Sequence, residues 1–287
     1  MKKFFNKLFC SGDWHVAISN HGIFQYIKNP VGYWIADPFL LKTKDSLYLF
    51  VEAFDKKKEL GRIGYLDSQS NFTNLKIILS NNTHFSFPNV FVFNEKVFLL
   101  PENGEGGEVA LYILDAFPNG VHKLCALLYG NYVDTALVFV KNDKLYLISY
   151  DADKHKMLYL SFAFGSKDVK IIKTIDDKDR MLRPAGNSFF DGDMLYMPFQ
   201  DCSEKYGAKI ITKAICATES DLIFLEQKKV IDKDIFEGIR VDRIHTINRT
   251  SDGTFVVDYM KESFSISKPF KMLKRKIRRK NNRKKNI

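Results

Sequence analysis

The architecture of this chain can be approached from WIADPFLLKTKDSLYLFVE, residues 34–52. Two segments rich in apolar and aromatic residues flank a polar turn at residues 44–46, a pattern that predicts one β-hairpin. The hairpin carries one carboxylate near its start, Asp37, and another at its end, Glu52. Acids at both ends of a buried hairpin require partners or a function.

The same pattern returns four more times along the chain. Each copy has an apolar strand, a polar turn and a second apolar strand. Counted at residues 37, 88, 134, 184 and 245, the copies are separated by 51, 46, 50 and 61 residues, which leaves room for four strands per repeat. The further copies are FPNVFVFNEKVFLLPE (87–102), VDTALVFVKNDKLYLISY (133–150), RPAGNSFFDGDMLYMPFQD (183–201) and RIHTINRTSDGTFVVDY (243–259).

The segments between these hairpins supply the missing strands, and no helical periodicity competes with them. Five four-stranded sheets arranged radially predict an all-β fold, a five-bladed β-propeller, whose closure protects the sheet edges. The last repeat runs short of strands, so we expect residues 13–19 to pair with it and close the ring. The expected outer strands are 62–67 with 75–80, 108–114 with 121–128, 157–164 with 169–175, and 208–217 with 222–231.

In a propeller, the start of each inner strand and the end of the next strand lie on the same face, so the polar hairpin ends should gather around one channel mouth. Hairpin ends are often polar because loops face water, but unpaired charge in a narrow channel is costly, and we therefore favour a ligand site. Aromatic residues before the inner strands could stack on sugars or pack between blades. The expected rim residues are Asp37, Glu52, Glu102, Asp134, Arg183, Gln200, Asp201, Arg243 and His245, and the aromatic residues are Trp34, Phe85, Phe87 and Tyr132.

Length and composition favour one soluble domain without a bound metal or cofactor. The 287 residues are 45% apolar, and none of the apolar runs approaches the roughly 20 residues of a membrane-spanning helix. The four cysteines include no CxxC pair, and the six histidines include no HxH or HExxH motif. A divalent ion held by the acidic rim stays open as an alternative.

The formal charge of +10 is concentrated at the end of the chain. Eleven basic residues and no acid lie from Lys268 onward, whereas the other 267 residues hold 33 basic and 34 acidic groups. We expect three parts: an amphipathic segment at 1–12, the propeller at 13–267 and a basic tail at 268–287. The tail is either a solvated segment or, together with the similar MKKFFNKLF at 1–9, an anchor on an anionic membrane, where each basic group gives about 1 kcal/mol.

The N-terminal segment lacks the long apolar core and cleavage site of a secretory signal, which favours a cytoplasmic protein on the inner face of the membrane. Nucleic acid is not an expected partner, because the body of the chain has no basic stripe with interleaved aromatic residues.

Several stretches resemble the N-terminal domain of the plant glucosamine inositolphosphorylceramide transferase family and its bacterial relatives near polysaccharide genes. The resemblance spans about residues 13–259, and its most specific part is RPAGN with QDCSEKYG, within 183–207. The other matching stretches are ADPFL (36–40), FPNVFVF (87–93), LLPENG (99–104), EVALY (108–112), VDTALVF (133–139) and IHTIN (244–248). The plant protein has a separate C-terminal glycosyltransferase domain, to which nothing in this sequence corresponds.

That domain is similar in architecture to the five-bladed propellers of glycoside hydrolase families 43 and 32. In family 43, an Asp opening blade one is the general base, an Asp opening blade three orients the acid, and a Glu opening blade four donates the proton. The resemblance puts Asp37 and Asp134 in the first two places. Arg183 stands in the third, and it cannot donate a proton at neutral pH. Glu102 or Asp201 could supply the missing acid from another blade.

We therefore expect a carbohydrate-active propeller, with glycosyl transfer to a surface polysaccharide or glycolipid precursor as the leading function. Asp37 and Asp134 are the predicted catalytic residues, and Arg183 would bind the phosphate of a nucleotide- or lipid-linked sugar donor. The alternatives are a non-catalytic glycan-binding subunit and a furanoside hydrolase. The other predicted substrate-binding residues are Glu52, Glu102, Asp201, His245 and His84.

Overall fold

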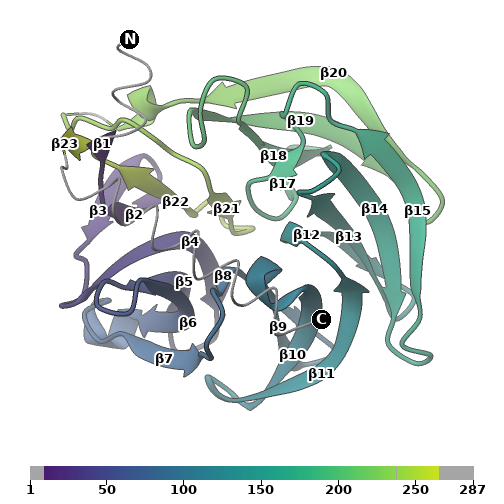
Figure 1. Ribbon diagram of the computed structural model, residues 1–287, viewed down its shortest axis with the longest axis horizontal. Helices are drawn as coiled ribbons and strands as arrows, with labels where there is room; N and C mark the ends of the chain where they lie inside the picture. The colour runs from purple at the N-terminus through teal and green to yellow at the C-terminus, as the bar shows by residue number, and fades with distance from the viewer. Residues whose placement is uncertain (1–9, 237, 265–287) are drawn as a thin grey trace.

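The computed structural model describes residues 10–236 and 238–264. Five antiparallel sheets stand in a ring around a central axis (Figure 1), which confirms the predicted five-bladed β-propeller. Among these described residues, no helix has the length and apolar character needed to cross a membrane.

The first four blades follow one another along the chain, each with its first strand nearest the axis (Figure 1). Blade one contains β4 (Tyr33–Lys42), β5 (Leu47–Asp55), β6 (Leu60–Asp67) and β7 (Lys76–Leu79). Blade two contains β8 (Ser86–Phe93), β9 (Lys96–Glu102), β10 (Glu108–Ala116) and β11 (Asn119–Tyr129). Blade three contains β12 (Tyr132–Lys141), β13 (Lys144–Asp151), β14 (Lys156–Ala163) and β15 (Val169–Asp176). Blade four contains β16 (Arg183–Pro184), β17 (Phe189–Asp191), β18 (Met194–Asp201), β19 (Lys209–Ala217) and β20 (Leu222–Ile231).

Blade five joins the two ends of the chain. It contains β21 (Ile247–Arg249), β22 (Phe255–Met260), β2 (Trp14–Asn20) and β3 (Ile23–Ile27). The predicted pairing of residues 13–19 with the last blade is confirmed, because β2 runs antiparallel to β22. The fourth strand, β3, was not predicted.

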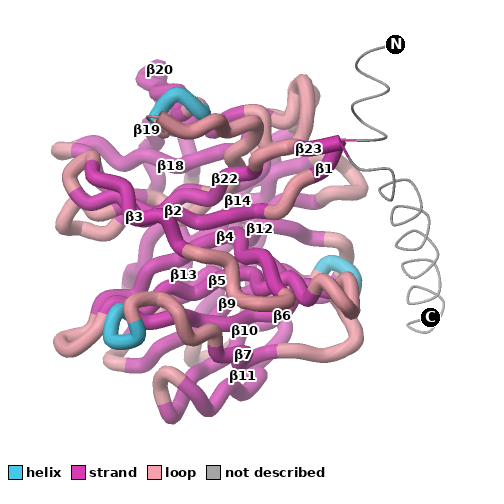
Figure 2. Tube along the Cα trace, turned by 90° about the vertical axis from the view of Figure 1, so that its left-hand side faces the viewer, coloured by secondary structure: helices cyan, strands magenta, loops and turns pink. Residues whose placement is uncertain are grey.

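Short elements complete the description of the chain. A two-stranded sheet pairs β1 (Cys10–Ser11) with β23 (Ser263–Phe264), and both lie at the outer edge of the ring (Figure 1), toward one of its two faces (Figure 2). Three single-turn helices are η1 (Ser68–Ser70), η2 (Gly104–Gly106) and η3 (Lys233–Ile235).

The inner strands of the first three blades share a kink close to the channel mouth. Asp37, Phe87 and Asp134 have left-handed backbone angles, with φ of 49°, 45° and 48°. The strand register shifts at each of these places, as in a β-bulge. The equivalent position in blade two is therefore Phe87, one residue before the position used to count the repeats. A kink of this kind removes a backbone N–H from the strand ladder, so that the N–H needs another acceptor.

The inner strand of blade four is interrupted, since β16 and β17 are separate short strands. Gly186 lies in the gap with φ of 147°, and a Cβ there would stand 1.9 Å from the carbonyl oxygen of Ile247 in blade five. The close approach is fixed by a hydrogen bond from the Ile247 N–H to the Ala185 carbonyl, 2.7 Å long. A residue with a side chain at position 186 would push the two blades apart.

Apolar side chains fill the spaces between blades, and amides fill part of the axis. Phe39 and Phe87 meet edge to face between blades one and two, with ring centres 4.9 Å apart. Near the axis, the Asn187 amide donates to the Asn89 side chain at 2.8 Å. These two asparagines come from blades four and two, which are not neighbours, so this hydrogen bond ties opposite sides of the ring together.

Candidate functional site

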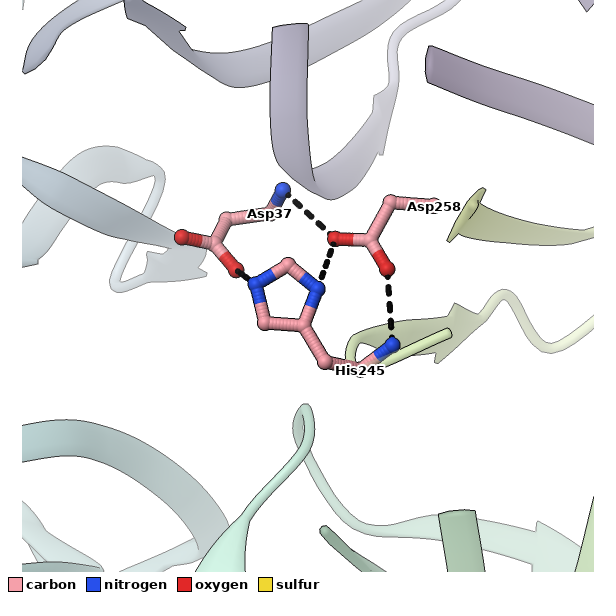
Figure 3. A group of neighbouring side chains, drawn as sticks. All are labelled: Asp37, His245 and Asp258. Carbon is pink, nitrogen blue, oxygen red and sulfur yellow. Dashed lines mark hydrogen bonds and ion pairs between the residues drawn. The ribbon is translucent and has the colours of Figure 1, made fainter. Parts of the chain in front are cut away.

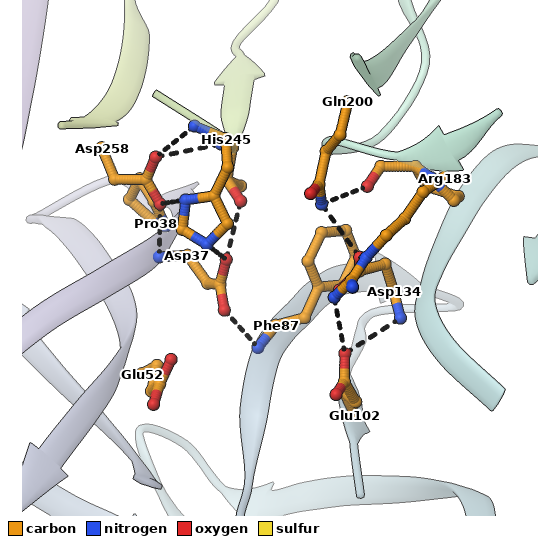
Figure 4. Close-up of polar contacts among 12 residues, drawn as sticks. Asp37, Pro38, Glu52, Phe87, Glu102, Asp134, Arg183, Gln200, His245 and Asp258 are labelled. Atoms are coloured by element: carbon orange, nitrogen blue, oxygen red, sulfur yellow. Dashed lines mark hydrogen bonds and ion pairs between the residues drawn. The ribbon is translucent and has the colours of Figure 1, made fainter. Parts of the chain in front are cut away.

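The polar hairpin ends gather at the mouth where the inner strands begin (Figure 4). They form three groups. The His245 cluster consists of Asp37, His245 and Asp258, and the Arg183 cluster consists of Glu102, Asp134, Arg183 and Gln200. The third group is the pair of Glu52 and His84.

Three of these carboxylates have a structural role, because each accepts the N–H freed by a kink in the next blade. Asp258 accepts from the Asp37 N–H at 3.0 Å, and Asp37 accepts from the Phe87 N–H at 3.1 Å. Glu102 accepts from the Asp134 N–H at 3.2 Å. We call these three contacts the kink clamps. A buried N–H without an acceptor would cost about 1–3 kcal/mol, so the clamps explain why acids occupy these hairpin ends.

The His245 cluster is buried, and its imidazole lies between the carboxylates of Asp37 and Asp258 (Figure 3). The Nδ1 atom of His245 lies 2.7 Å from Asp258, and Nε2 lies 3.1 Å from Asp37. Asp258 also accepts the backbone N–H groups of His245 and Thr246, both at 3.0 Å. The Thr246 hydroxyl donates to Asp37 at 2.7 Å, and Trp14 covers the imidazole at 4.1 Å between ring centres.

The cluster holds a charged histidine between two acids. Burial alone would lower the pKa of His245, but the carboxylates of Asp258 and Asp37 raise the pKa well above its ordinary value of 6.5. Burial raises the pKa of Asp37, yet the charge of His245 and the hydrogen bonds to the carboxylate bring this pKa below its ordinary value. An imidazolium with both nitrogens directed at carboxylates has no lone pair to offer.

The same three residues are the set that could hold a metal ion within residues 10–236 and 238–264, with ligand atoms within 4.8 Å of one another. Histidine binds metals through a neutral ring nitrogen. Here both ring nitrogens face acids, and Asp258 already accepts three backbone N–H groups. The donor set therefore fits a protonated histidine better than a metal ion.

The Arg183 cluster is more open to solvent. The Nε atom of Arg183 forms an ion pair with Asp134, and Nη2 lies 3.7 Å from Glu102. The Gln200 amide donates to Asp134 at 2.9 Å and to the Pro184 carbonyl at 3.0 Å. The Arg183 side chain is 25% exposed, compared with 3% for the His245 side chain. This cluster is the one in which a cation can meet a ligand.

Of the two residues considered as the missing acid, Glu102 has the suitable environment. Burial and the nearby Asp134 raise the pKa of Glu102 well above its ordinary value, although the Arg183 charge acts against them. The pKa of Asp201 is lowered, because hydrogen bonds from Ser203 and Lys209 outweigh the effect of burial.

Asp201 also lies apart from the three groups. Its carboxylate accepts the Ser203 N–H at 3.0 Å and lies 3.3 Å from the Lys209 ammonium. Gln200 precedes it in β18 and points to the Arg183 cluster, and adjacent residues of a strand point to opposite faces. The contact of Asp201 with substrate stays a prediction, because its carboxylate contacts Ser203 and Lys209.

Glu52 and His84 form a pair at the edge of blade one. The Nε2 atom of His84 lies 3.1 Å from Glu52 Oε1, and Nδ1 of the same ring accepts the Gly61 N–H at 3.1 Å. Burial raises the pKa of Glu52, and the neighbouring His84 only partly offsets this. Both residues were predicted to contact substrate, and both lie at the mouth.

Tyr206 links the two clusters and was not predicted from the sequence. Its ring lies 5.3 Å from the Arg183 guanidinium and 5.1 Å from the His245 ring centre. The residue is 39% exposed, so the ring is accessible at the mouth. Arg243, which was expected at the rim, donates to the Tyr206 carbonyl at 3.0 Å and thereby supports the loop.

The aromatic residues predicted at the rim pack against other parts of the protein. Phe85 and Phe87 are 1% and 0% exposed, so they pack between blades, which was the other interpretation of these residues. Trp34 stacks on Phe54 at 4.4 Å between ring centres.

Asp258 is the second functional residue that the sequence analysis missed. It ends the hairpin of the fifth repeat, in the place that Glu52 and Glu102 hold in the first two, so the signal for it was present in the sequence. The looser pattern of that repeat obscured the match.

Comparison with known structures supports the fold alone. The catalytic domain of the GH62 α-L-arabinofuranosidase of Coprinopsis cinerea superposes with a TM-score of 0.57 at 11% identity, covering 78% of this chain and 90% of that domain. A thermostable family-43 glycoside hydrolase gives 0.54 at 14% identity, covering 83% and 92%. An exo-β-1,3-galactanase from Clostridium thermocellum gives 0.56 at 14% identity, covering 83% and 61%.

Comparison with known sequences identifies the family. The chain is 29% identical over 243 residues to glucosamine inositolphosphorylceramide transferase 1 of Arabidopsis thaliana, covering 78% of this chain and 31% of that protein. It is 30% identical over 191 residues to the protein of that name from Oryza sativa subsp. indica, covering 62% and 25%. The chain thus spans less than a third of these relatives. Because the family profile matches residues 26–257, the chain belongs to the family described as glucosamine inositolphosphorylceramide transferase 1, N-terminal.

Proposed function

We propose that this chain is a glycosyltransferase that transfers a sugar from a nucleotide- or lipid-linked donor to a surface polysaccharide or glycolipid precursor. The observation that carries the proposal is the Arg183 cluster, a partly exposed guanidinium beside two acids at the mouth of a hydrolase-like propeller. Donor phosphates need a cation to balance the charge of the leaving group, and a guanidinium suits that task.

The geometry of Arg183 leaves room for such a ligand. Its contacts with acids among the described residues use Nε and Nη2, so Nη1 can still donate to a phosphate oxygen. Burial lowers the pKa of Arg183, but Asp134, Tyr206 and Glu102 together raise this pKa well above its ordinary value, and the side chain stays charged at any physiological pH. Tyr206 adds an aromatic face beside it for a sugar ring.

The predicted catalytic roles of Asp37 and Asp134 stay proposals, and the structure sharpens them. Both oxygens of Asp37 have protein donors, namely the Thr246 hydroxyl and His245 on one and the Phe87 N–H on the other. Asp37 is therefore better suited to hold neighbouring groups in position than to take a proton. Asp134 is held by Arg183 and Gln200 through one oxygen, so the other oxygen is the one that would have to meet a sugar hydroxyl.

Two alternative functions have support of their own. A glycan-binding accessory module is favoured by the share of the relatives that this chain spans, 31% and 25%. Furanoside hydrolysis is favoured by the raised pKa of Glu102 beside Asp134, which suits a proton donor.

An assay with one labelled donor separates these functions. The chain is incubated with radiolabelled uridine-diphosphate glucosamine and vesicles that contain phosphatidylinositol. Label in the lipid extract supports transfer, free labelled sugar supports hydrolysis, and label retained without reaction supports binding alone. Arg183→Ala should abolish transfer, while a chain whose transfer is unaffected by this change would contradict the proposed role of the cluster.

We also propose that an anionic membrane on its cytoplasmic side is a partner. The predicted segments at 1–12 and 268–287 lie largely outside the described residues. Within the described residues, β1 pairs with β23, so the two ends of the described chain lie side by side. Deletion of residues 268–287 should release the chain from phosphatidylserine vesicles, and equal sedimentation of both forms would contradict the anchor.

A further inference from the structure

Glu52 differs from the other acids at the mouth in its partners. Asp37, Glu102 and Asp258 each accept the N–H of a kinked strand and so hold two blades together. Among the described residues, the partner found for the Glu52 side chain is His84. Glu52 is 5% exposed, and its Oε1 atom accepts no conventional hydrogen bond. The structural explanation for the other acids does not extend to this one.

His84 presents a defined ring nitrogen to Glu52. Its Nδ1 accepts the Gly61 N–H at 3.1 Å and therefore carries no proton. The proton of the neutral ring then sits on Nε2, which faces Glu52 Oε1 at 3.1 Å. The imidazole thus lies at ion-pair distance from the carboxylate without a well-aligned hydrogen bond to Oε1. Among the described residues, no partner is found for the second carboxylate oxygen.

The space for this pair is provided by Gly61. A Cβ at that position would lie 2.7 Å from Glu52 Oε1, 2.8 Å from His84 Cε1 and 2.4 Å from the Phe85 carbonyl oxygen. The φ angle of Gly61 is not positive, so glycine is required here by the lack of room and not by the backbone conformation. The arrangement therefore depends on three residues from separate parts of blade one and the loop that follows it.

The charges around Glu52 permit proton transfer. Burial raises its pKa, and Asp37 raises it further, whereas His84 and His245 lower it. The result lies above the ordinary value of 4.5. A carboxylate of this kind holds a proton more firmly than an exposed one and remains able to release it.

We propose that Glu52 is the catalytic base that takes the proton from the acceptor hydroxyl, with His84 as its positioning residue. This inference rests on the proposed glycosyl transfer. The acceptor O–H donates its proton to the free oxygen of Glu52, and the acceptor oxygen forms a bond to the anomeric carbon of the donor. The bond from that carbon to the donor phosphate oxygen breaks, and its electron pair leaves with the phosphate. The proton on Glu52 then passes to the released phosphate or to water.

The first test replaces the carboxylate and measures transfer. Glu52→Gln should lower kcat about 100-fold or more with a KM within about threefold, because the amide keeps the shape but cannot accept a proton. Glu95→Gln is the matched control, since Glu95 lies in the exposed turn between β8 and β9, and it should retain wild-type kcat. A Glu52→Gln variant with wild-type kcat would overturn the proposal.

The second test uses the pH profile to separate positioning from a merely structural role. In the wild type, kcat should rise with pH as Glu52 loses its proton. His84→Ala removes a group that lowers the Glu52 pKa, so the rising limb should move to higher pH. His84→Gln keeps an N–H donor and should recover part of the shift. An unchanged limb in His84→Ala would contradict the role of His84.

The third test needs no substrate and therefore separates failure of this inference from failure of the proposed function. Carboxyl NMR of glutamate-labelled protein should show one signal that titrates above the ordinary range, is absent in Glu52→Gln and moves to higher pH in His84→Ala. If the signal behaves so but the wild type transfers no sugar, the proposed function fails and the proton-holding pair stands. If Glu52 titrates like an exposed glutamate, the inference fails whatever the activity.

Discussion

The His245 cluster and the Arg183 cluster stand on opposite sides of the same mouth, and each places a cation between two acids. They differ in exposure, because the His245 side chain is 3% exposed and the Arg183 side chain 25%. They also differ in the hydrogen bonds that their acids accept. The acids around His245 accept four backbone N–H groups, from Asp37, Phe87, His245 and Thr246.

This contrast separates two uses of charge on one rim. The His245 cluster joins blade five to blade one, where the chain closes on itself, and its charges have no capacity left for a ligand. The Arg183 cluster joins blades two, three and four but keeps an accessible cation and an acid of raised pKa. Position on the rim alone therefore does not identify a ligand-binding residue.

The largest effect is expected when the His245 cluster is disrupted. Asp258→Ala should lower the free energy of unfolding by about 3–5 kcal/mol, because it leaves a buried imidazolium and three backbone N–H groups without their acceptor. Denaturant unfolding measures the loss. Asp252→Ala is the control, since Asp252 pairs with Lys42 at the surface and such pairs give under about 1 kcal/mol. Equal losses of stability in the two variants would show that the His245 cluster contributes no more to the fold than a surface ion pair.

A smaller loss of stability and a larger loss of binding are expected when the Arg183 cluster is disrupted. Arg183→Ala should lower the free energy of unfolding by about 1–3 kcal/mol, because Asp134 keeps the Gln200 amide and Glu102 keeps the Asp134 N–H as hydrogen-bond donors. Its affinity for a nucleotide sugar should fall at least about tenfold, as measured by calorimetry. Arg183→Lys should not restore it, since an ammonium lacks the planar fork. If Asp258→Ala weakened binding more than Arg183→Ala in folded protein, the assignment of the two clusters would be reversed.

The pH dependence of stability sharpens the same comparison. The pKa of Glu102 is raised in the folded state, so its contribution is fully present below the ordinary value of 4.5 and is lost as pH rises through the folded value. Glu102→Gln cannot titrate and should gain about 1 kcal/mol over the wild type between pH 4.5 and 8. The pKa of His245 is raised from 6.5, so its contribution is fully present below 6.5 and is lost as pH rises through its folded value. Thermal unfolding of the wild type and of Glu102→Gln between pH 4.5 and 8 measures how the stability difference changes with pH. Stability curves that run parallel across this range would contradict the role of Glu102.

The fold was predictable because five hairpins repeat the same alternation of strand and polar turn. The closure was predictable for the same reason, since the last repeat lacked strands that residues 13–19 could supply. The strand β3 was missed because it is largely exposed, with Ile23 at 79%, so its sequence does not resemble a buried strand.

The roles of the acids were less predictable than their positions. Whether a carboxylate is free depends on a kink in the next blade, and the left-handed angles of Asp37, Phe87 and Asp134 fall on residues of unlike chemistry. Sequence shows the acid but not the N–H that it accepts. The same reasoning applies to Arg183, whose pairing with Asp134 depends on two blades meeting at the mouth.

The smallest effect is expected at Asp201, which the sequence placed on the rim. Asp201→Asn should change the affinity for a nucleotide sugar by less than about twofold, because its carboxylate contacts Ser203 and Lys209 and has no contact with the Arg183 cluster among the described residues. Gln200→Ala is the informative neighbour, since the Gln200 amide holds Asp134 at 2.9 Å and its loss should weaken binding measurably. Calorimetry on both variants compares two adjacent residues that point to opposite faces of β18. If Asp201→Asn lost as much affinity as Arg183→Ala, the ligand would have to reach the far face of this strand, and the mouth could not be its site.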